Sequence, residues 1–180
     1  SSFRTWVYRI VINHVLNMKK SLGEKKHTNN FDEYWKIIEN VPDRDLPKQE
    51  NYNVEMQTLV NEVKVSCLTG MLLCLDREQR LVFILGSIFQ AGDRIGAEMM
   101  DMTKDNFRQK LSRARKQLYN FMYNRCSLMD KKNPCKCEKK TRALIDSGYV
   151  NPKNLLFNID YVRSVEGTIE VKAKKFDDML

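Results

Sequence analysis

Histidine, glycine and long apolar runs are all scarce in this sequence. Its 180 residues include two histidines and seven glycines, with no glycine-rich phosphate loop and no histidine placed by a motif beside a nucleophile. Hydrolytic and transfer chemistry therefore find little support, and we expect no enzyme. The longest uninterrupted apolar runs are residues 71–75 and 81–85, whereas a membrane-spanning helix needs about 20 apolar residues. We therefore expect no membrane segment.

A disulfide framework is not indicated either. Five cysteines are an odd number, and no secretory signal is visible, which favours reduced thiols in a cytoplasmic protein. Cys67 and Cys74 share an apolar stripe and are expected in the core. Cys126, Cys135 and Cys137 lie in a lysine-rich segment, where we expect the lysines to lower the thiol pKa. No cofactor is required. The three thiols are candidate zinc ligands, but a plain packing role is the preferred interpretation.

Acidic residues are absent from one long interval near the middle of the chain. Between Asp105 and Asp130 six basic residues occur without a single Asp or Glu, in a chain of net charge +8. A helix there would carry an apolar stripe and a cationic face, for which the phosphate backbone of a nucleic acid is the natural partner. A solvated basic face on an ordinary helix pair is the plainer alternative.

The same region has the pattern of a helix-turn-helix. Four apolar residues with spacings of four, three and four predict one buried helix face, namely Phe107, Leu111, Ala114 and Leu118. Thr103 is a good N-cap for this helix. A shorter helix is expected to run from Asp93 to about Met100, with Gly96 and Ala97 allowing close approach. The link Asp101–Thr103 is then the turn, where Asp tolerates a left-handed backbone.

The whole chain is predicted to be mainly α-helical, with a small mixed C-terminal appendage. We distinguish a terminal helix (1–20), a polar linker (21–53), a helical DNA-binding domain (54–123) and a cysteine- and lysine-rich extension (124–180). Local signals add a short helix at 31–38, a capping box at Asp76 and Gln79, a helix at 139–147 ended by Gly148, and a strand at 168–171.

Two segments together resemble the extracytoplasmic-function sigma factors of bacterial RNA polymerase. Residues 3–20, FRTWVYRIVINHVLNMKK, are similar to the end of that family's region two, through Trp6, Tyr8, Arg9, Ile10 and Asn13. Residues 75–118 are similar to region four and end in the family's pattern of a hydrophobic residue, a variable one and Arg-Ala-Arg, here Leu111 to Arg115. The resemblance closely covers about a third of the chain, and its two segments occur in the family's order.

The resemblance implies a transcription initiation factor that reads the promoter −35 element and directs the RNA polymerase core to promoters. Residues carried over as base-edge contacts are Lys104, Asp105, Asn106, Arg108 and Gln109. Those carried over as phosphate contacts are Lys110, Arg113, Arg115 and Lys116. Asn13 matches the position associated with −10 reading, with Arg9 and the pair Lys19 and Lys20 as backbone contacts. An anti-sigma factor is a further candidate partner.

The sequence also departs from the family. It begins partway through region two, so we expect these residues to bind duplex DNA better than they initiate transcription. Asp76 stands where the family usually has Pro, and residues 86–94 fit poorly. Two alternatives stay open: a helix-turn-helix repressor or activator, and a thiol-based metal or redox sensor whose helix pair binds a protein.

Overall fold

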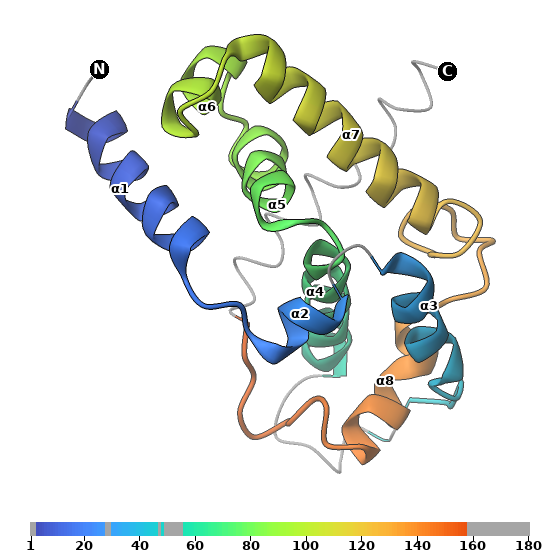
Figure 1. Ribbon diagram of the computed structural model, residues 1–180. Helices are drawn as coiled ribbons and strands as arrows, with labels where there is room; N and C mark the ends of the chain where they lie inside the picture. Colours follow the sequence, from blue (N-terminus) through green and yellow to red (C-terminus); the bar gives the residue numbers. More distant parts are fainter. Residues whose placement is uncertain (1–2, 28–29, 47, 49–55, 158–180) are drawn as a thin grey trace. The chain divides into compact units, whose positions relative to one another are not determined.

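The computed structural model describes residues 3–27, 30–46, 48 and 56–157, and these are mainly helical, as the sequence predicted (Figure 1). No helix within these described ranges is long and apolar enough to cross a membrane. The chain divides into two compact units, which are described separately. Unit 1 comprises the described residues of Ser1–Phe31 and Met71–Phe121, and unit 2 those of Asp32–Gly70 and Met122–Leu180.

Unit 1 is built on α1 (Phe3–Asn17), α2 (Leu22–His27), α5 (Arg77–Phe83), the π-helix η2 (Ile84–Ile88), α6 (Asp93–Met99) and α7 (Lys104–Met122), whose last residue lies beyond the unit boundary. One apolar cluster joins these helices. Its buried members are Ile12, Val82, Ala97, Met100 and Phe107. Because they come from α1, α5, α7 and the α6 segment, burial of this cluster holds the helices together.

Helix α1 directs only part of its apolar surface toward this core. Ile12 is buried and Leu16 packs beside it, whereas other apolar side chains of the helix are exposed, including Phe3, Trp6 and Ile10. Phe3 and Trp6 stack on each other with ring centroids 6.0 Å apart. The sequence therefore predicts this terminal helix but not the face that it buries.

Helix α5 begins as the sequence predicted and continues into a π-helix. The carboxylate of Asp76 accepts a hydrogen bond from the Gln79 N–H at 2.7 Å. Gln79 Oε1 is buried and accepts no hydrogen bond from the residues described, so the capping box is only half formed. In η2 the Phe89 N–H donates to Ile84 O at 2.9 Å. Gly86 lies so close to Leu111 that an added Cβ would be 2.6 Å from Leu111 Cδ2.

Unit 2 contains α3 (Phe31–Asn40), whose first residue belongs to unit 1, α4 (Met56–Leu73) as far as Gly70, and α8 (Cys137–Asp146). Its core cluster is formed by Leu59, Val60, Val63, Cys137 and Val150. The short helix expected at 31–38 is confirmed as α3. Tyr34 is buried there and donates its hydroxyl proton to Cys67 O at 3.0 Å.

The extension after α7 is partly described. The helix expected at 139–147 is present as α8, and Gly148 follows it with a φ of 73°. Cys126 and Cys135 form an isolated parallel bridge. Buried Glu62 of α4 accepts hydrogen bonds from the Leu156 and Phe157 N–H groups at 2.6 and 3.2 Å. The strand predicted at 168–171 lies outside the described residues.

Candidate nucleic-acid interface

The connection between α6 and α7 has a defined backbone geometry. Asp101 adopts a φ of 54°, in the left-handed region that Asp tolerates better than most residues. The Met102 N–H donates to Ala97 O at 3.0 Å. Thr103 Oγ1 then accepts from the Asn106 N–H at 3.2 Å, so the predicted N-cap of α7 is confirmed. These bonds fix the direction in which α7 leaves the turn.

Close packing holds α6 against α7. An added Cβ at Gly96 would lie 2.3 Å from Phe107 Cζ, so the ring occupies the space that any side chain would need. Phe107 and Ala114 are fully buried, Leu118 is buried and Leu111 is half-buried. The predicted apolar stripe of α7 is therefore its inner face, and the prediction that small residues allow close approach is confirmed at Gly96.

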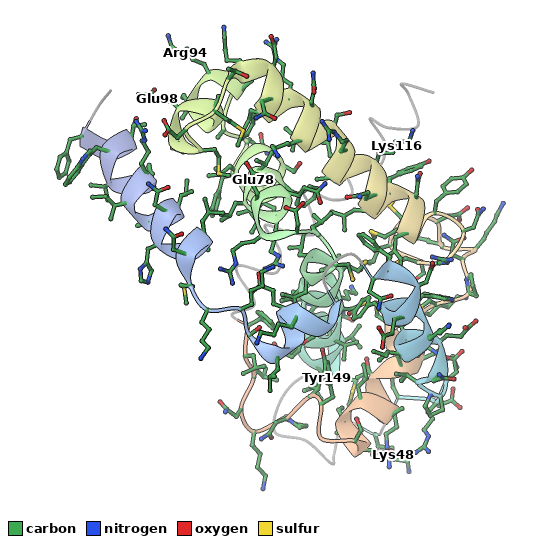
Figure 2. The ribbon with its side chains drawn as sticks, in the orientation of Figure 1. Lys48, Glu78, Arg94, Glu98, Lys116 and Tyr149 are labelled. Atoms are coloured by element: carbon green, nitrogen blue, oxygen red, sulfur yellow. The ribbon has the colours of Figure 1, made fainter. Side chains whose placement is uncertain are left out.

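The opposite side of α7 carries the polar residues that the resemblance singles out. Lys116 extends from this helix in Figure 2, and Arg94 extends from neighbouring α6. Of the α7 residues that the resemblance singles out, the exposed ones are Lys104, Asp105, Asn106, Arg108, Gln109, Arg113 and Lys116. The arrangement presents cations and hydrogen-bonding groups from a rigid helix, as an anionic partner requires.

Arg108 is exposed but already has acidic neighbours. It forms an ion pair with Asp93 at the start of α6, and its Nη1 lies 3.6 Å from an Asp105 carboxylate oxygen. The hydrogen bond from Arg108 lowers the pKa of Asp93. Asp93 therefore positions the guanidinium beside the turn, and any DNA contact by Arg108 has to replace this ion pair.

Two expected phosphate contacts are engaged inside unit 1 instead. Lys110 Nζ lies 2.9 Å from a Glu78 carboxylate oxygen. Arg115 donates from Nε to Ser87 Oγ at 3.0 Å and from Nη2 to Gly86 O at 3.3 Å. Burial lowers the pKa of Arg115. Arg115 thus ties α7 to the π-helix, a role that the sequence analysis missed.

The residues carried over from region two are placed on α1. Asn13 is exposed, as are Lys19 and Lys20 beyond the end of the helix. Arg9 forms an ion pair with Asp101, the left-handed residue of the α6–α7 turn. The structure therefore brings Arg9 to the start of α7, although 92 positions separate Arg9 from Asp101.

The pKa values of the three C-terminal thiols differ from the values expected from the sequence. Burial raises the pKa of the Cys126, Cys135 and Cys137 thiols, and the opposing effect of Lys140 on Cys135 is smaller. Lys140 therefore acts on the pKa of Cys135 in the predicted direction, but burial outweighs it, and no lysine is among the causes of the pKa shifts at Cys126 and Cys137. Within the described part of the chain, no group of three or more His, Cys, Asp or Glu side chains is arranged to hold a metal ion. Zinc binding stays a prediction.

Comparison with family models, curated proteins and solved structures gives no match to this chain. Evidence on function therefore comes from the residues themselves.

Proposed function

We propose that this protein is a promoter-binding transcription initiation factor of the extracytoplasmic-function sigma type, in which α6 and α7 form a helix-turn-helix. The supporting observation is the division of α7 into two faces. One face is buried through Phe107 and Ala114, while the first turns expose polar side chains next to a capped helix start. A major groove about 12 Å wide admits such a helix.

The exposed side chains divide into two roles. Asn106, Arg108 and Gln109 lie in the first turns of α7, where they reach base edges, since Arg pairs with guanine and Asn or Gln with adenine. Arg113 and Lys116 lie farther along the exposed side and neutralise phosphates. Lys110 and Arg115 contribute mainly by holding α7 in place, because both are half-buried and have partners within unit 1, whereas Arg108 is exposed.

Selection of duplexes from a random pool tests DNA reading by the 180-residue chain. We expect enrichment of one short asymmetric motif, which Arg108→Ala relaxes or abolishes. Lys25→Ala is the matched control, because it removes one exposed positive charge from α2 in the same unit. A palindromic motif would identify a dimeric repressor or activator, and the absence of any enriched motif would overturn sequence reading by α7.

Binding to the RNA polymerase core separates a sigma factor from other helix-turn-helix proteins. We expect the chain to be retained by immobilised core enzyme and to add specificity for the selected motif to that enzyme. Motif binding without any retention by the core enzyme would leave a DNA-binding regulator and reject the initiation factor.

A further inference from the structure

Cys126 and Cys135, both half-buried residues, are paired in unit 2 across the isolated parallel bridge. The Cys135 N–H donates to Arg125 O at 3.0 Å, and the Ser127 N–H donates to Cys135 O at 3.1 Å. Such bonds hold two backbones at the spacing of adjacent strands, about 4.7–4.9 Å. A disulfide spans Cα separations of about 4.4–6.8 Å, so this pair is within bonding range.

The turn between the two cysteines maintains this placement. Asn133 Nδ2 donates to Cys126 O at 2.9 Å, and the Met129 N–H donates to the same oxygen at 3.0 Å. A further bond runs from the Asn133 N–H to Asp130 O at 2.9 Å. The segment therefore returns Cys135 to Cys126 through its own hydrogen bonds, and the two residues are neighbours before any covalent bond forms.

The neighbouring Cys137 is a poorer partner. Its side chain is buried in the core cluster with Leu59 and Val60, at the first position of α8. Between Cys135 and Cys137, Lys136 is extended, with φ −110° and ψ 122°. Two extended residues advance about 6.6 Å, at the upper end of the Cα separations found in disulfides. Because side chains two residues apart in an extended segment point to the same side, their Cβ atoms are about as far apart, beyond the Cβ separation of about 3.5–4.5 Å that a disulfide needs. Pairing with Cys137 would require the start of α8 to unwind.

We propose that Cys126 and Cys135 are a reversible oxidation site that hydrogen peroxide converts to an intrachain disulfide. One of the two thiols loses its proton, and the thiolate attacks one peroxide oxygen. The O–O bond breaks, the departing hydroxide takes up a proton to become water, and a sulfenic acid remains. The sulfur of the other cysteine then displaces the sulfenic hydroxyl, which leaves as a second water with the proton of that thiol, and the S–S bond forms. Two thiols lose two electrons and two protons in total, and peroxide is reduced. This inference does not rest on the proposed DNA-binding function.

Burial is the main influence on both thiols and raises the pKa of each. The positive charge of Lys140 opposes this effect at Cys135, and backbone hydrogen bonds from Leu128 and Met129 oppose it at Cys126, so either thiol can react first. Since burial still leaves both thiol pKa values raised, the thiolate fraction is small at neutral pH. The oxidation rate should therefore rise about tenfold per pH unit from pH 7 upward, as the thiolate population grows.

Peroxide treatment of the 180-residue chain, followed by thiol counting in denaturant and by peptide mapping, tests the proposal. We expect the count to fall from five to three. The tryptic peptides that contain Cys126 and Cys135 should be joined, with a mass two hydrogen atoms below their sum, and dithiothreitol should restore both. Cys126→Ser and Cys135→Ser should each abolish the joined peptide, whereas the control Cys137→Ala should retain it.

Several results would overturn this assignment. These are retention of all five thiols, sulfinic acids without a crosslink, a crosslink between Cys135 and Cys137, or crosslinked dimers in place of the internal bond. Circular dichroism of each variant shows whether the fold is retained. If a serine variant unfolds, the peptide map of the oxidised wild-type chain is sufficient to test the proposal, because it identifies the joined cysteines directly.

Discussion

Arg77 links the carboxylate of Glu24 to the C-terminal end of α1. Its Nε and Nη2 donate to the two oxygens of Glu24, at 2.8 and 2.5 Å. Its Nη1 donates to the carbonyl oxygens of Val15 and Leu16, at 2.9 and 3.0 Å. One guanidinium therefore donates to carbonyl oxygens in the last turn of α1 and compensates a buried carboxylate on α2.

The pH dependence of stability should reveal this ion pair. The hydrogen bond from Arg77 holds the pKa of Glu24 below its ordinary value, so the unfolded chain binds a proton more readily than the folded one. The stabilisation is complete above the ordinary glutamate pKa and is lost as the pH falls through the folded value. We expect Glu24→Gln to lower Tm at neutral pH and to flatten the acid decline of Tm, as measured by calorimetry.

The matched control for this experiment is Glu39→Gln. Glu39 is exposed on α3, so the substitution removes the same charge without a buried partner. Parallel acid profiles for Glu24→Gln and wild type would mean that the link between Arg77 and Glu24 does not stabilise unit 1.

Gly96 should be intolerant of a methyl group. Gly96→Ala places a Cβ within 2.3 Å of the buried Phe107 ring, so the ring or α6 has to move. We expect a loss of about 1–3 kcal/mol in the free energy of unfolding, the usual cost of overpacking a core. Urea denaturation measures it. Gly92→Ala is the control, because nothing lies within 4 Å of a Cβ there. Similar losses for both variants would contradict the close contact between α6 and α7.

The turn before α7 should depend on the backbone tolerance of Asp101 more than on its charge. Asp101→Ala retains the φ of 54° only with strain, so we expect a loss of about 1–2 kcal/mol. Asp101→Asn removes the ion pair with Arg9 but tolerates the left-handed region, and it should remain close to wild type. Thermal unfolding of both variants compares the two effects. An Asn variant as unstable as the Ala variant would assign the role to the ion pair.

The local features of this fold could be predicted from sequence because neighbouring residues determine them. The buried face of α7 follows from the spacing of Phe107 and Ala114, and its start follows from the Thr103 cap. The turn at Asp101 was likewise expected, since few residues accept a positive φ. In each case the pattern and the physical cause lie within one or two helical turns.

The remaining features depend on residues that are distant in sequence. Arg115 was expected on the outer face, but the π-helix places Ser87 and Gly86 within its reach. Pairing of Arg9 with Asp101 spans 92 positions, and no local pattern indicates it. The raised pKa of the Cys135 thiol was not expected either, because the lysines around Cys135 are visible in the sequence whereas its burial is not.

Arg113 and Arg115 provide the sharpest contrast between DNA contact and support of the helix. Arg113 is exposed, so Arg113→Ala should leave stability nearly unchanged and weaken duplex binding. The slope of log Kd against log salt should fall by about 0.9, the value for one lost phosphate contact on B-DNA. Arg115→Ala removes the hydrogen bonds to Ser87 and Gly86 and should cost about 1–2 kcal/mol in stability, with the salt slope largely retained.

Fluorescence anisotropy titrations at several salt concentrations, together with urea denaturation, measure both effects on the two variants. Because each variant loses one arginine, the difference between them cannot come from net charge alone. Equal changes in salt slope would show that Arg115 leaves Ser87 to contact phosphate. An unchanged slope for Arg113→Ala would remove Arg113 from the DNA-binding face, and the phosphate contacts would then have to come from elsewhere on α7.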